Sequence, residues 1–80
     1  MTEMEALMQR ITVNEDVLAG KPTIRGLRIS VEQILRAMAA GVPQEDLLAD
    51  YPELEQEDIL AVLMYAADLV SDTRVYPVAI

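Results

Sequence analysis

The basic residues of this chain are concentrated in one short stretch, GKPTIRGLRI, at residues 20–29. It holds half of the six lysines and arginines of a chain whose formal charge is −8. Its two glycines can adopt positive φ, so a hairpin here could present all its cations on one side. Clustered cations of this kind, with one more a few residues later, are the groups that contact nucleic-acid phosphates. The stretch therefore predicts a nucleic-acid-binding site made of Lys21, Arg25, Arg28 and Arg36.

A run of acidic residues follows this stretch, and its side chains could pair with the arginines instead of leaving them to bind nucleic acid. Residues 45–58 carry seven acidic residues and no basic one: Glu45, Asp46, Asp50, Glu53, Glu55, Glu57 and Asp58. On a second interpretation, Arg25 and Arg28 pair with these acids, within the chain or across a dimer. Segregated charge suggests two surfaces with two partners, although a solvated acidic face would produce the same pattern. Both interpretations stay open.

Catalytic chemistry is not expected from this sequence. The chain has no cysteine and no histidine, so a thiolate nucleophile and the commonest general base and metal ligand are missing. Segment GKPT lacks the upstream glycine of a phosphate-binding loop. Adjacent acids such as Glu57 and Asp58 diverge on a helix and are favoured at helix starts by the dipole alone. We expect no enzyme activity, no cofactor and no metal site.

The aliphatic content is high for so short a chain. Of its 80 residues, 52% are hydrophobic and only three are aromatic, all tyrosines. A domain of this size buries only about 60% of its surface on folding, so we expect a homodimer or a complex with another protein. The opening MTEMEALMQR lacks the basic region of a signal peptide. No apolar run approaches the roughly 18 residues of a membrane helix, and we expect a cytoplasmic protein.

The elements that would position the charges are mainly helical. Ser30 followed by Gln33 is a capping box, and apolar residues at 31, 34, 35 and 38 then mark one buried helical face. This pattern predicts a helix over 31–40, ended by Gly41 in the left-handed conformation. Pro43 at a first helical position opens a short second helix that ends at Tyr51-Pro52.

A third helix is predicted from near Gln56 to about residue 70, and it is apolar nearly all round. One apolar face consists of Ile59, Leu63, Ala66 and Val70, and a second of Leu60, Val62, Ala67 and Leu69. The second and third helices have the proportions of a helix-turn-helix pair.

The remaining segments are shorter. Residues 11–29 read as short strands and turns that form a small hairpin, with a tight turn at Arg25-Gly26. Residues 1–10 are an N-terminal extension that could form a short helix. Residues 71–80 are an apolar C-terminal tail. The predicted fold is therefore mainly α: a single domain over residues 11–70 in which a short β-hairpin precedes a three-helix bundle.

Residues 11–69 also resemble the domain-of-unknown-function 433 family. The marks of the resemblance, quoted at their spacing, are Gly20-Lys21-Pro22, Ile24-Arg25-Gly26, Arg28-Ile29, Ala40-Gly41, Asp50-Tyr51-Pro52, Leu54, Glu57-Asp58-Ile59 and Tyr65-Ala66-Ala67. Leu27 departs from the pattern, because the family usually has a threonine there whose hydroxyl can contact a phosphate or cap a turn.

The resemblance implies a homeodomain-like fold and the role of a VapB-like antitoxin. It implies a PIN-like ribonuclease toxin as partner and binding to the shared promoter DNA. We expect the acidic helices and the apolar tail to engage the toxin through Glu57, Asp58, Val75, Tyr76 and Val78. The alternatives are a DNA-binding regulator without a toxin and a structural dimerisation domain.

Overall fold

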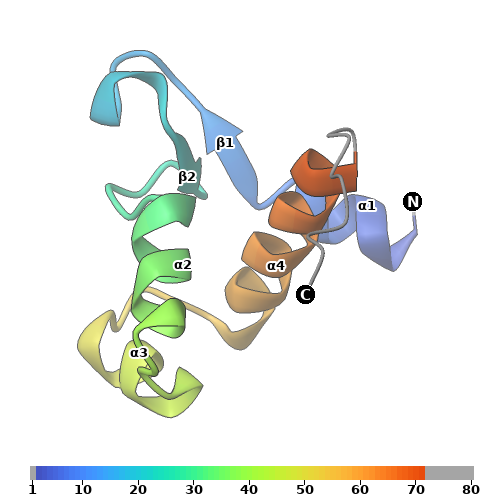
Figure 1. The fold of residues 1–80 in the computed structure, drawn as a ribbon. Helices are drawn as coiled ribbons and strands as arrows, with labels where there is room; N and C mark the ends of the chain where they lie inside the picture. The colour runs from blue at the N-terminus through green and yellow to red at the C-terminus, as the bar shows by residue number, and fades with distance from the viewer. Residues whose placement is uncertain (1, 72–80) are drawn as a thin grey trace, which may run out of the picture.

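The computed structural model describes residues 2–71, and Figure 1 shows their mainly helical fold. In chain order the elements are α1 (Glu3–Met8), β1 (Ile11–Val13), the 3₁₀ turn η1 (Leu18–Gly20), β2 (Pro22–Ile24), α2 (Val31–Ala39), α3 (Gln44–Asp50) and α4 (Gln56–Ser71). The predicted hairpin and the three predicted helices are confirmed. Helix α1 adds a fourth, which packs against α4.

The hairpin is antiparallel and short. Ile11 lies opposite Ile24, and Val13 lies opposite Pro22. Arg25 and Gly26 follow with φ of 47° and 73°, and Leu27 N–H donates to the Ile24 carbonyl at 2.8 Å. Two successive positive φ values identify a type I′ turn, the type that matches strand twist. The predicted tight turn is therefore confirmed, and it leads the chain from β2 towards α2.

Helix α2 begins and ends where the sequence indicates. The Ser30 hydroxyl accepts from Gln33 N–H at 2.9 Å, which is the predicted N-cap. The Gln33 amide donates instead to the Tyr51 hydroxyl at 2.7 Å, so it ties α2 to the end of α3. Gly41 has φ of 88°, and Val42 N–H donates to the Ala37 carbonyl at 3.0 Å. This is a Schellman C-cap.

Among the later boundaries, only the start of α3 differs from the prediction, by one residue. Pro43 is the N-cap of α3 rather than its first helical residue, with extended backbone at ψ of 152°. Its carbonyl accepts the N–H groups of Asp46 and Leu47. Helix α3 ends before Tyr51-Pro52 and α4 begins at Gln56, both as predicted.

The core lies between the hairpin, α2, α3 and the first half of α4. Its fully or nearly buried members are Ile24, Ile29, Val31, Ile34, Leu47, Leu54, Ile59 and Val62. Helix α4 is not buried along either predicted apolar face: Ile59 is 1% exposed, whereas Leu63 is 43% and Val70 59% exposed. Only the first part of α4 lies in the core, because the helix extends beyond it.

Candidate functional site

The first turn of α4 contains a carboxylate that the solvent does not reach. The side chain of Asp58 is 0% exposed. Its Oδ2 accepts the backbone N–H of Glu55 at 2.8 Å, as a residue at this helical position does when it caps the N-terminus. One such bond does not compensate a buried charge, which is costly unless it is paired and fully hydrogen-bonded.

Arg25 supplies the main counter-charge to Asp58. Its Nε donates to Oδ1 at 3.0 Å and its Nη2 to Oδ2 at 2.9 Å, a bidentate arrangement. The same Nη2 donates to the carbonyl of Glu53 at 2.6 Å. These hydrogen bonds fasten the turn after β2 to the start of α4 and to the segment that precedes it. Arg25 therefore pairs with an acid of its own chain, as the second interpretation of the sequence held.

Arg10 completes this group, and sequence reasoning missed it. Its Nη1 donates to Asp58 Oδ1 at 2.9 Å and to Glu55 Oε1 at 2.7 Å. These partners lie 45 and 48 residues away along the chain, so no local spacing pointed to them. We call Arg10, Arg25, Glu55 and Asp58 the Asp58 cluster. It joins the start of β1, the turn after β2 and the start of α4.

The Asp58 cluster sets the protonation of its carboxylate. Burial alone raises the pKa of Asp58, but hydrogen bonds from Arg25, the Glu55 backbone and Arg10 outweigh burial and hold it below its ordinary 3.8. A carboxylate with a lowered folded-state pKa stabilises the fold above the ordinary pKa. That contribution is lost as the pH falls through the folded-state value.

We therefore expect the domain to be acid-labile. The free energy of unfolding, measured by urea denaturation with circular dichroism, should fall as the pH drops below about 4. The charge-neutral variant Asp58→Asn should be less stable at pH 7 and show a flatter profile between pH 5 and pH 3. Parallel profiles for the two proteins would contradict this role of Asp58.

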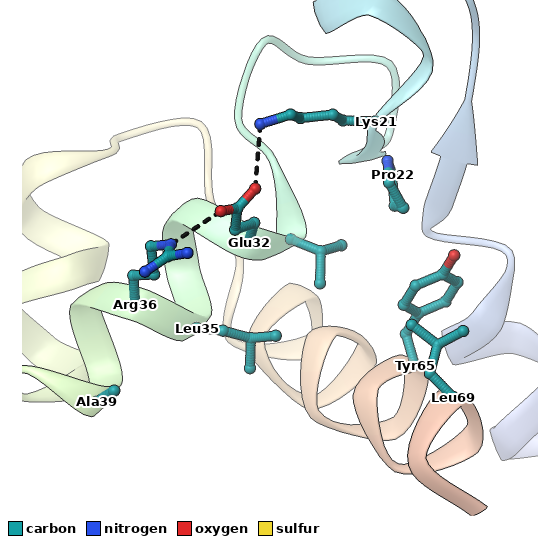
Figure 2. Close-up of a pocket in the computed structure, with 9 residues that line it drawn as sticks. Lys21, Pro22, Glu32, Leu35, Arg36, Ala39, Tyr65 and Leu69 are labelled. Atoms are coloured by element: carbon teal, nitrogen blue, oxygen red, sulfur yellow. Dashed lines mark hydrogen bonds and ion pairs between the residues drawn. The ribbon is translucent and has the colours of Figure 1, made fainter. Parts of the chain in front are cut away.

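Two of the other predicted cations share one carboxylate, as Figure 2 shows. Lys21 Nζ lies 3.1 Å from Glu32 Oε1, and Arg36 Nε lies 2.8 Å from Glu32 Oε2. Hydrogen bonds from Arg36 and then Lys21 lower the pKa of Glu32. Lys21 and Arg36 remain 58% and 79% exposed, so these ion pairs contribute little to stability.

The four predicted phosphate contacts thus lie in three separate settings. Arg25 belongs to the Asp58 cluster, and Lys21 and Arg36 meet at Glu32. Arg28 is exposed and makes no ion pair with any residue from 2 to 71. They do not form one unpaired group of cations on one side of a hairpin, as the sequence suggested, and nucleic-acid binding by these residues stays a prediction.

A groove of about 460 Å³ lies between α2 and α4. Figure 2 shows Leu35 of α2 pointing across it towards Tyr65 and Leu69 of α4. The lining is Pro22, Val31, Leu35, Ala39, Tyr65 and Leu69, with Lys21, Glu32 and Arg36 at one rim. We call this feature the α2–α4 groove.

The predicted partner-binding residues fall into three groups. Glu57 is exposed at the start of α4. Asp58 has no surface to offer, because its side chain is buried and both of its oxygens are occupied within the chain. Val75, Tyr76 and Val78 lie outside the described residues.

Six acids are exposed from α3 to the start of α4, and Glu55 is the one that pairs, with Arg10. The other five make no ion pair with another described residue. We call these five exposed residues the acidic segment: Glu45, Asp46, Asp50, Glu53 and Glu57. With Arg10 and Arg25 engaged at Asp58, the acidic segment carries negative charge that no basic side chain in the described part of the chain offsets.

Residues 11–66, from β1 to the middle of α4, match the model of a family described as a protein of unknown function, DUF433. The chain belongs to this family. The matched region of this DUF433 domain contains the hairpin, the core and three of the four members of the Asp58 cluster; Arg10 lies one residue before it.

A curated relative of this DUF433 domain is the uncharacterized protein y4eO of Sinorhizobium fredii (strain NBRC 101917 / NGR234). It is 32% identical over 66 residues, which are 82% of this chain and 30% of the relative. The domain therefore corresponds to under a third of that protein. No solved structure matches the chain.

Residues 2–71 of this DUF433 domain contain neither a cluster of metal-binding side chains nor a helix that could span a membrane. No group of three or more acidic side chains within residues 2–71 is arranged to hold a metal ion. No helix in the same range combines the length and the apolar character that crossing a bilayer requires.

Proposed function

We propose that this DUF433 domain is a non-enzymatic binding module that serves as the antitoxin of a type II toxin–antitoxin pair. Its partner is a PIN-like ribonuclease toxin, and it acts as a homodimer in the cytoplasm. One observation carries the proposal: the domain turns two arginines inward to Asp58 and leaves the acidic segment without a counter-ion among residues 2–71.

The reasoning is electrostatic. A ribonuclease that binds RNA phosphates presents positive charge around its active site. The acidic segment offers carboxylates to the same field, and complementary charge raises the association rate and selects the partner. Binding there would occupy the surface that RNA needs.

The experiment is co-expression of this protein with the product of the neighbouring gene. We expect the two to co-purify and the growth defect caused by the neighbouring gene alone to be relieved. Failure to co-purify, together with undiminished toxicity, would end the proposal.

A charge-neutralised variant tests the surface itself. Replacing four members of the acidic segment should weaken toxin binding by about tenfold at low salt, chiefly through slower association; the changes are Glu45→Gln, Asp46→Asn, Glu53→Gln and Glu57→Gln. Surface plasmon resonance separates the two rate constants.

The control for this variant removes the same number of charges elsewhere. It carries changes at exposed acids outside the acidic segment: Glu3→Gln, Glu15→Gln, Asp16→Asn and Asp68→Asn. Its association rate should change much less. Equal losses in both variants would indicate a dependence on net charge and count against a defined surface.

A second candidate function is binding of promoter DNA through a homeodomain-like arrangement of α2, α3 and α4. It is favoured by Arg28, which is exposed and has no ion pair among the described residues. The acidic first turn of α4 opposes base contacts in the major groove. A mobility shift on the promoter at low salt, abolished by Arg28→Ala, would support it; an unchanged shift would exclude this contact.

A further inference from the structure

The α2–α4 groove contains no residue of the Asp58 cluster and none of the acidic segment. Its lining is apolar on both sides: Leu35 and Ala39 come from α2, and Tyr65 and Leu69 from α4 (Figure 2). Its volume of about 460 Å³ is within the range of ligand-binding pockets. An open apolar trough between two helices is the shape into which a third amphipathic helix lays its apolar face.

The rim of the groove has a charge opposite to that of the chain. Two cations, Lys21 and Arg36, share the single carboxylate of Glu32, which leaves one net positive charge. An ammonium has three donors and a guanidinium has five N–H groups. Each cation uses one of them on Glu32, so both can bind a further acceptor. In a chain of net charge −8, this rim selects for an acidic group beside an apolar one.

The length of α2 sets the size of the occupant. From Val31 to Ala39 the helix rises about 12 Å, which is a little over two turns. A partner helix running along it would place apolar residues at three or four successive positions spaced three and four apart. An acidic side chain on the flank of that stripe would face Lys21 or Arg36.

We propose that the α2–α4 groove binds a short amphipathic helix of the partner protein, with an apolar stripe flanked along one side by Asp or Glu. The inference rests on the proposed function and gives the partner a second contact, distinct from the cationic surface that meets the acidic segment. Charge complementarity at the rim favours this occupant over a basic helix.

The test uses two synthetic probes and the full chain. Both are fluorescein-labelled helical peptides of about 15 residues with leucines spaced three and four apart. One carries glutamates along one side of the stripe, and the other carries lysines there. Fluorescence anisotropy should show the glutamate peptide binding about threefold to tenfold more tightly. The overall charge of −8 acts in the opposite direction, so this preference has to come from the rim.

Two variants localise the binding. Ala39→Trp fills the groove from an exposed position and should weaken binding of the glutamate peptide by at least about tenfold. Its control is Ala49→Trp on α3, exposed and outside the groove, which should bind normally. Lys21→Gln with Arg36→Gln should abolish the preference between the peptides, whereas Arg28→Gln should keep it.

Several results would overturn the proposal. They are equal or tighter binding of the lysine peptide, and peptide binding that Ala39→Trp leaves unchanged. Gain of affinity when Val75, Tyr76 and Val78 are replaced by serine would assign the groove to the chain's own tail. Self-association that Ala39→Trp abolishes would assign it to a second copy. Binding of anilinonaphthalene sulfonate without peptide binding would assign it to small amphiphiles.

The experiments distinguish a failure of the proposed function from a failure of the groove inference. If Ala39→Trp captures the toxin normally while the acidic-segment variant does not, the groove inference is wrong and the antitoxin function stands. If the peptides discriminate as expected but no toxin is captured, the groove binds a helix of some other partner.

Discussion

Replacing Arg25 with alanine is expected to lower the free energy of unfolding by about 3–5 kcal/mol. The reason is the carboxylate left behind. Asp58 is 0% exposed, and without Arg25 it loses its bidentate partner and keeps only Arg10 and the Glu55 N–H. A buried charge deprived of its counter-ion retains its desolvation penalty in full. Urea denaturation at pH 7, followed by circular dichroism, measures the loss.

Arg28→Ala is the matched control, because it removes an arginine three residues along the same stretch. Arg28 is exposed and has no ion pair within residues 2–71, so its loss should change stability by less than about 0.5 kcal/mol. The double variant Arg25→Ala with Asp58→Ala should cost much less than the sum of the two single variants. Additive losses, or equal effects at Arg25 and Arg28, would contradict the pairing.

The different roles of these two arginines show where sequence reasoning stops. Local signals were sufficient for the turn and for α2, since a glycine at positive φ, a serine cap and a C-terminal glycine each act within a few residues. The same local view placed Lys21, Arg25 and Arg28 together. Tertiary packing instead sets the partners of Lys21 and Arg25, which lie 11 and 33 residues away along the chain.

Asp58 illustrates the same limit from the acidic side. At the start of a helix an aspartate is explained by the dipole alone, so no local pattern distinguished Asp58 from Glu57 beside it. The fold buries Asp58 and leaves Glu57 exposed. Adjacent helical residues point about 100° apart, and only the positions of Arg10 and of the turn after β2 decide which of them receives the arginines.

Helix α4 shows how periodicity can be correct and still incomplete. The sequence places Ile59 and Leu63 on one face, four residues apart. The side of the helix that packs on the core runs through Ile59, Val62 and Tyr65, and the core ends before the last turns of α4. Ile59 is therefore 1% exposed, whereas Leu63 is 43% and Val70 59% exposed. A hydrophobic pattern reports which side of a helix can be buried. It does not report how far the neighbouring elements reach along it.

The second large effect follows from this difference. Ile59→Ala should lower the free energy of unfolding by about 2–5 kcal/mol, because it leaves a cavity among closely packed aliphatic side chains. Leu63→Ala should cost less than about 1 kcal/mol, since the leucine is already partly hydrated and alanine is the better helix former. If Ile59→Ala does not fold, Ile59→Val should still show a loss of about 0.5–1.5 kcal/mol.

The pair also tests whether a second chain covers α4, because a dimer would bury Leu63 without changing Ile59. In a monomer both losses are independent of protein concentration. If α4 lies in a homodimer interface, the loss at Leu63 should increase and the unfolding midpoint of the unmodified protein should rise with concentration, since association stabilises by mass action. Equal and concentration-independent losses at the two positions would contradict the described burial of α4. A small, constant loss at Leu63 would leave this face open in the free domain and place any dimer contact elsewhere on its surface.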